Sequence, residues 1–113
     1  MAKRRIILEM GAGNDLHGGD YTKAAVRAVR DALSHCSLAF LRALDIDPAD
    51  MVVDVTIGVQ RPDRVDLTAV EAAFAHGQVR VRAVPGGLDV PDDDGAGATV
   101  VASAAIAVHI PVP

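Results

Sequence analysis

The sequence has few aromatic residues, a single cysteine, and no apolar run long enough to cross a membrane. Only three of its 113 residues are aromatic, Tyr21, Phe40 and Phe74. The core must therefore be built from Val, Ile, Leu and Ala, which are small side chains. A chain of this size with such a core gains burial when copies associate. We expect one domain over residues 1–113 that forms homo-oligomers.

The lone cysteine, Cys36, excludes an intrachain disulfide framework. An excess of basic residues is also missing: 15 Asp and Glu stand against 11 Lys and Arg, a formal net charge of −4. This balance argues against general binding to nucleic acid or to an anionic membrane surface. Neither a secretory signal nor a transmembrane segment is visible. These absences predict a soluble, cytoplasmic protein without nucleic-acid or membrane partners.

Hydrophobic patterning in the first half predicts a strand, a loop and a long helix. Residues 4–10 contain an apolar run without alternation, which is typical of a strand buried on both faces. The glycine-rich residues 11–20 follow as a loop. Asp20 or Thr22 then caps a helix whose apolar spacing continues to about Leu44.

The second half predicts two strands around a short helix, and then a last strand. Residues 51–59 and 78–84 alternate as half-buried strands, and a helix beginning at Asp66 or Thr68 lies between them. Residues 91–97, with three consecutive aspartates, read as a surface loop before a long strand at 99–112. The order β-α-β-α-β-β predicts an α+β fold, an α/β sandwich in which two helices cover one face of a mixed four-stranded sheet. Its other face then lacks cover, which a second copy would supply.

The segment 11–20 is the strongest candidate site, because it combines four glycines with Asp15, His17 and Asp20. A nucleotide-binding G-x-G-x-x-G motif would need glycine where Leu16 stands, and the carboxylates would repel phosphate. We therefore expect no nucleotide and no other cofactor. Gly11, Gly13, Gly18 and Asp20 are candidate ligand-binding residues.

Asp15 and His17 are two residues apart, so in an extended loop they can share a proton or a ligand. In one interpretation Asp15 orients His17 for general-base catalysis. In the other, both residues hydrogen-bond the backbone of their own loop. No further His, Cys or acidic residue lies at a recognisable ligand spacing, so no metal site is expected.

Lys23, Arg27 and Arg30 share one face of the predicted long helix. This stripe is a solvated face, an oligomer contact, or a group that holds an anion beside the loop. Ser103 stands among small residues, which permit close approach of a strand or a ligand. A Ser103–Lys23 nucleophilic pair is a further candidate.

Five residues of the loop form a recognisable motif: Gly11, Gly13, Asp15, His17 and Gly18 match the G-x-G-x-D-x-H-G signature of the Lin0512 family. The following residues 20–35, the Gly86-Gly-Leu88 turn and the alanine-rich last strand also resemble that family. This resemblance covers essentially the whole chain. It implies that the loop is the site, but it brings no established reaction.

The chain is more distantly similar to the repeat unit of ring-opening amidohydrolases such as cyanuric acid hydrolase and barbiturase. That similarity implies a homotrimer, with Lys23 and Ser103 as possible catalytic partners, although the amidohydrolase motifs themselves are missing.

Two hypotheses follow from the sequence. The first is an oligomeric hydrolase-like enzyme acting on a small polar, anionic or cyclic amide molecule near a subunit interface. His17 would be its base or orienting group, Asp15 the partner of His17, and Lys23 and Arg27 the anion-holding groups. The second is a non-catalytic homo-oligomer that binds a small ligand or has a structural role.

Overall fold

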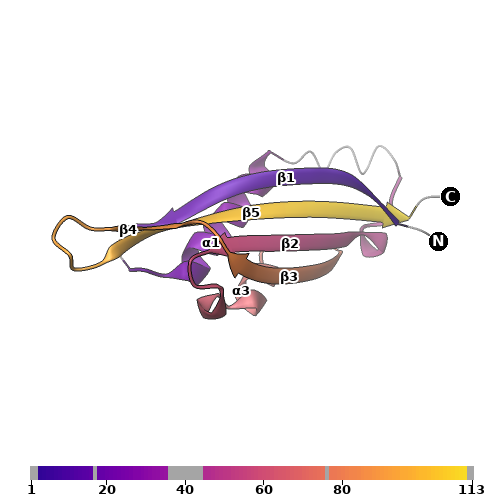
Figure 1. The fold of residues 1–113 in the computed structure, drawn as a ribbon. Helices are drawn as coiled ribbons and strands as arrows, with labels where there is room; N and C mark the ends of the chain where they lie inside the picture. The colour runs from indigo at the N-terminus through magenta and orange to yellow at the C-terminus, as the bar shows by residue number, and fades with distance from the viewer. Residues whose placement is uncertain (1–2, 17, 36–44, 76, 112–113) are drawn as a thin grey trace.

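A computed structural model describes residues 3–16, 18–35, 45–75 and 77–111. Its centre is a mixed sheet in the order β1-β5-β2-β3, with a short strand β4 that pairs with β5 (Figure 1). The β2–β3 pair is parallel, whereas β5 is antiparallel to each of its three neighbours. The strands are β1 (Lys3–Asp15), β2 (Val52–Val59), β3 (Gln78–Pro85), β4 (Leu88–Pro91) and β5 (Ala98–Pro111).

In the part of the chain that the structure describes, two α-helices lie on one face of this sheet, α1 (Tyr21–Ser34) and α3 (Leu67–Glu71). The 3-10 turns η1 (Pro48–Asp50) and η2 (Pro62–Arg64) lie in the connections on either side of β2. The predicted α+β class, mixed sheet and paired helices are confirmed. The predicted number of strands is wrong, because β4 adds a fifth. Within the described residues, no helix has the length and apolar character needed to cross a membrane.

Side-chain caps begin both helices. Asp20 caps α1 by accepting the N–H of Lys23 at 3.0 Å, and Asp66 caps α3 by accepting the N–H groups of Thr68 and Ala69. Helix α1 ends earlier than predicted, because the N–H of His35 donates to the carbonyl of Ala32 in a tight i→i−3 turn. The rest of the predicted helix, residues 36–44 with Cys36 and Phe40, lies outside the described residues.

Strand β1 is longer than the sequence predicted. Gly11 and Gly13 are inside it, paired with Ala104 and Ala102 of β5, rather than in a loop. Helix α1 crosses directly over them: a Cβ on Gly11 would lie 2.5 Å from the carbonyl oxygen of Ala28, and one on Gly13 equally close to that of Ala24. These glycines therefore let the helix backbone approach the sheet backbone.

The core lies between the sheet and α1 and is made of small aliphatic side chains. The even-numbered residues of β5 from Val100 to Ile110 are buried, and so are Val53, Val55, Ile57 and Val59 of β2. The alternation predicted for β2 is thus confirmed. Ala24, Ala25, Ala28 and Ala32 supply the facing side of α1 and are fully buried.

The opposite face of the sheet, which we call the open face, is covered by no described helix. Register places Leu8 and Met10 of β1 and Leu88 and Val90 of β4 on it, beside the odd-numbered residues of β5. All four are exposed, Met10 by 67% and Leu88 by 61%. Alternating apolar residues thus face solvent here, which is unusual for a folded monomer.

The strands β4 and β5 form a hairpin arm that projects from the body of an elongated molecule measuring 57 × 23 × 18 Å (Figure 1). Gly86 and Gly87 let the chain step from β3 across the end of β2 to pair with β5, with Gly87 at a φ of 59°. The tip of the arm carries Asp92, Asp93 and Asp94, where the sequence predicted a surface loop. The start of β1 and the end of β5 lie at the other end of the molecule (Figure 1).

Candidate functional site

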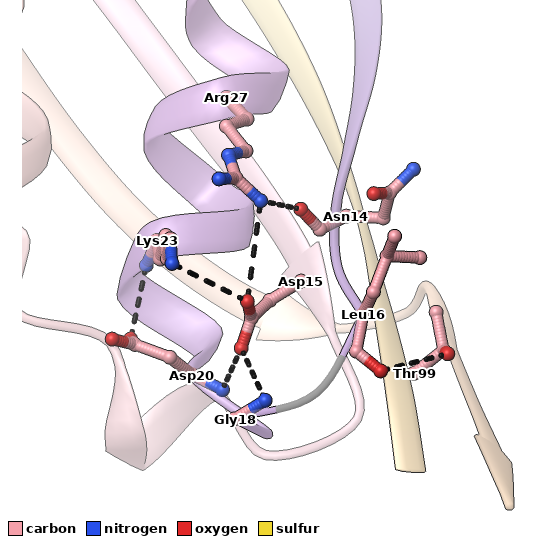
Figure 2. Close-up of polar contacts among 8 residues, drawn as sticks. All are labelled: Asn14, Asp15, Leu16, Gly18, Asp20, Lys23, Arg27 and Thr99. Carbon is pink, nitrogen blue, oxygen red and sulfur yellow. Dashed lines mark hydrogen bonds and ion pairs between the residues drawn. The ribbon is translucent and has the colours of Figure 1, made fainter. Parts of the chain in front are cut away.

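Asp15 is the last residue of β1 and the centre of the site. It is the one charged side chain among the buried residues of the described chain, with 4% of its surface exposed. Its Oδ2 accepts the N–H of Gly18 at 3.1 Å and the N–H of Asp20 at 2.9 Å (Figure 2). The loop between β1 and α1 is therefore folded around this carboxylate.

Two cations from α1 approach the other oxygen of Asp15. Lys23 Nζ lies 3.7 Å and Arg27 Nη1 3.9 Å from Oδ1, and Arg27 also donates to the carbonyl of Asn14 at 2.7 Å (Figure 2). The two residues are one helical turn apart, so they project from the same side of α1. Both remain about half exposed, 53% for Lys23 and 46% for Arg27. Arg30, the third member of the predicted stripe, is exposed and makes no ion pair within the described residues.

These contacts lower the pKa of Asp15 below its ordinary value of 3.8. The main cause is the hydrogen bond from the N–H of Asp20, and Lys23, Gly18 and Arg27 add to it, whereas desolvation acts in the opposite direction. Asp15 is consequently a carboxylate at neutral pH with both oxygens engaged. It anchors the loop and orients cations; it is a poor proton acceptor. Its predicted partner, His17, lies outside the described residues.

Asp15, Leu16, Gly18, Asp20, Lys23 and Arg27 line a shallow hollow of about 370 Å³, which we call the Asp15 hollow. The structure thus brings together most of the residues that the sequence singled out. Asp20 has a structural task as well, as the cap of α1. Within the described chain, no group of three His, Cys, Asp or Glu side chains is placed to hold a metal ion.

Three predicted site residues lie elsewhere. On the side where a Cβ would lie, Gly11 and Gly13 are covered by α1, so we correct their assignment as ligand-binding residues of the loop: on that side they permit close packing. Ser103 lies on the open face beside Gly58, whereas Lys23 belongs to the helix on the other side of the sheet. A Ser103–Lys23 pair is therefore not formed within one chain.

The geometry of β1, its glycines and the carboxylate that ends it can be compared with known proteins. The family model described as "Conserved hypothetical protein (Lin0512_fam)" matches residues 5–108. The chain belongs to the Lin0512 family. No functionally curated protein matches it.

A crystal structure of an FtsZ-like protein of unknown function from Nostoc punctiforme PCC 73102 is similar to this Lin0512 protein over 99% of both chains. The two share 32% sequence identity, with a TM-score of 0.87. The fold is therefore shared with an experimentally determined relative.

The structure adds two contacts that sequence reasoning missed, and both join the site loop to the arm. The Tyr21 hydroxyl donates to Oδ2 of Asp89 in β4 at 2.5 Å, and the Thr99 hydroxyl donates to the carbonyl of Leu16 at 3.4 Å. Tyr21 directly follows the helix cap, so the start of α1 is tied to the base of the arm. Partners 68 residues apart leave no local pattern in the sequence.

The Tyr21–Asp89 contact gives a spectroscopic prediction. Hydrogen bonding to Asp89, with smaller contributions from desolvation and the Asp89 charge, raises the pKa of Tyr21 above its ordinary 10.0. Because this is the only tyrosine in the sequence, tyrosinate absorbance in an alkaline titration reports it alone. We expect ionisation to begin above the range of a free tyrosine, and Asp89→Asn to move it back. An ordinary Tyr21 titration in the wild-type chain would contradict the contact.

Proposed function

We propose that this protein binds a small carboxylate-bearing molecule in the Asp15 hollow, with Lys23 and Arg27 as its anion-holding residues. The observation that supports the proposal is the convergence of two half-exposed cations on one oxygen of a buried carboxylate. At 3.7 and 3.9 Å these are loose ion pairs rather than tight hydrogen bonds. Both cations therefore keep donor capacity for a ligand.

The chemistry of the two cations suits a carboxylate. A guanidinium offers five N–H donors in a fixed plane, and an ammonium offers three. Asp15 holds both head groups beside the hollow before a ligand arrives, which reduces the entropy that binding would cost. A hollow of about 370 Å³ has the size of a small-molecule site.

Charge around the hollow favours singly charged ligands. Asp15 and Asp20 together offset the formal charge of Lys23 and Arg27. A multiply charged phosphate would meet both carboxylates, whereas a monocarboxylate can lie against the cations alone. Small monocarboxylates are therefore the preferred class.

A hydrolase would in addition need a group that transfers protons. Among the described residues of the hollow, Asp15 has a lowered pKa and both oxygens occupied. The enzyme hypothesis from the sequence therefore depends on His17. The enzyme hypothesis is tested separately, by measuring the turnover of cyclic amides by the wild-type protein and by His17→Ala.

The binding proposal is tested by calorimetry and thermal shift with acetate, lactate, benzoate and inorganic phosphate. We expect a monocarboxylate to bind and to raise the melting temperature. Losing one charge-assisted contact, in Lys23→Met or Arg27→Met, should weaken binding roughly ten-fold or more.

Arg30→Met is the matched control, since Arg30 is on the same helix but does not line the hollow. It should bind as the wild type does. The proposal fails if no carboxylate binds, or if the Lys23 and Arg27 variants bind as tightly as the Arg30 variant.

A further inference from the structure

The open face has a pattern that is symmetric along β5. Ser103 marks its middle, paired with Ala12 on one side and Gly58 on the other, and all three are small. Two residues from Ser103 toward the arm, Leu88 pairs with Val101. Two residues in the other direction, Met10 pairs with Ala105.

The next positions continue this symmetry. Four residues from Ser103 toward the arm, Val90 pairs with Thr99, and four residues the other way Leu8 pairs with Ala107. Beyond them the two ends of the face carry opposite charge. The arm ends in three aspartates, 92–94, and the other end carries Arg5 and Lys3, paired with His109 and Pro111.

We propose that the open face binds a second copy of this chain, face to face and antiparallel, around a two-fold axis near Ser103. In this arrangement the half of each face that carries Leu88 and Val90 covers the half of the partner's face that carries Met10 and Leu8. The acidic tip of each arm lies over the partner's Arg5 and Lys3. The small residues at the axis let the two sheets approach closely. One surface patch thus serves both copies, as a two-fold interface requires.

Charge complementarity favours this occupant and this orientation. Within the described residues neither Lys3 nor Arg5 has a carboxylate partner, although the chain as a whole is acidic. Lys3 instead donates to the carbonyl of Asp50 at 3.0 Å. A partner rotated the other way would place the three aspartates of one tip against those of the other, which is repulsive.

The rest of the face forms a polar border along β3. Arg80 makes a two-pronged contact with Asp54, at 2.7 and 3.0 Å, and Arg82 donates to Thr56. These polar side chains already have hydrogen-bond partners within the chain. A polar rim around an apolar centre is the usual arrangement in protein interfaces.

The size of the face is also sufficient. With strands about 4.8 Å apart that rise about 3.3 Å per residue, the five strands present roughly 750 Å². A standard interface buries about 600–1,000 Å² on each partner, so the area of the face lies within that range. This inference does not depend on the proposed ligand.

The first experiment measures mass by sedimentation equilibrium and light scattering of the whole chain. We expect twice the chain mass of 11.7 kDa. Met10→Lys, which places a charge in the apolar zone, should weaken the dimer roughly a hundred-fold. Leu67→Lys is the matched control: Leu67 is 40% exposed but belongs to α3 on the other side of the sheet, so this variant should remain dimeric.

The second experiment tests orientation by zero-length carbodiimide coupling, which joins a lysine to a carboxylate in direct contact. Lys3 and the arm tip are at opposite ends of a 57 Å molecule, so a link between them must join two copies. We expect Lys3 linked to Asp92, Asp93 or Asp94 by mass spectrometry. Reversing charge at one end (Lys3→Glu with Arg5→Glu) should weaken the dimer, and adding Asp92→Lys with Asp93→Lys should restore it.

Three outcomes would overturn the proposal. A monomer at all concentrations removes the interface, and a trimer, which the amidohydrolase resemblance implies, removes the two-fold axis. If Asp92→Lys with Asp93→Lys strengthens the dimer without any change at Lys3 and Arg5, the two arm tips lie against each other and the proposed orientation is wrong.

Discussion

Replacing Gly13 by alanine is expected to destabilise the protein by at least about 3 kcal/mol, although it adds a single methyl group. The new Cβ would lie 2.5 Å from the carbonyl oxygen of Ala24 and 2.6 Å from the carbonyl carbon of Arg27. Both are helix backbone atoms, which cannot rotate away as a side chain would. The clash is relieved only if α1 moves away from the sheet, and this movement opens the alanine-lined core.

Denaturant unfolding of Gly13→Ala and of Gly97→Ala makes the comparison. Gly97 is near the arm tip, and its added Cβ would meet only a side-chain oxygen of Asp92 at 3.2 Å. The Gly97 variant should stay within about 1 kcal/mol of wild type, because the aspartate can move. Equal effects at the two positions would contradict the close helix–sheet contact.

Asp15→Asn is expected to destabilise the fold at neutral pH and to change its acid response. The amide keeps the volume of the carboxylate but loses its charge, so the contacts with Lys23 and Arg27 weaken. Its NH₂ group donates and cannot accept, so an asparagine offers one accepting oxygen where Asp15 offers two: with that oxygen toward the N–H groups of Gly18 and Asp20, the NH₂ faces the cations of Lys23 and Arg27.

The pH dependence follows from the lowered pKa of Asp15. A carboxyl whose pKa is lower in the folded than in the unfolded chain stabilises the fold above the ordinary value of 3.8. That stabilisation is lost as the pH falls through the folded-state pKa. Melting curves from pH 7 to pH 2 should therefore show the largest gap between wild type and Asp15→Asn at neutral pH, and a closing gap below about pH 4.

Asp63→Asn, at an exposed position of η2 away from both the hollow and the open face, is the control and should melt as the wild type does. A gap between Asp15→Asn and wild type that stays constant down to pH 2 would show that Asp15 acts through shape and not through charge.

Much of the fold was predictable because its strongest signals are local. The alternation in β2 and the cap at Asp20 depend on neighbouring residues, and both are confirmed. The end of β1 was misjudged because glycine is typical of loops. Here Gly11 and Gly13 are extended, for a reason that depends on α1, which lies later in the chain. Strand β4 was missed since its four residues are all exposed and end in proline.

The site was partly predictable for the same reason. Asp15, Lys23 and Arg27 lie within thirteen residues, so a loop followed by a helix brings them together. Ser103 was grouped with Lys23 without knowledge of which face of the sheet each occupies. That choice depends on strand register, which one sequence does not reveal.

The contacts that α1 makes with β1 also protect an edge. Among the described residues β1 pairs with β5 alone, so its outer N–H and C=O groups form the longest edge of the sheet that no described strand covers. Side chains of α1 occupy that edge: Asp31 accepts the N–H of Ala12 at 2.9 Å, and Arg27 donates to the carbonyl of Asn14. Another chain therefore finds two of these backbone groups already bonded, which hinders growth of the sheet by strand addition. Arg27 thus connects the proposed ligand site with resistance to aggregation.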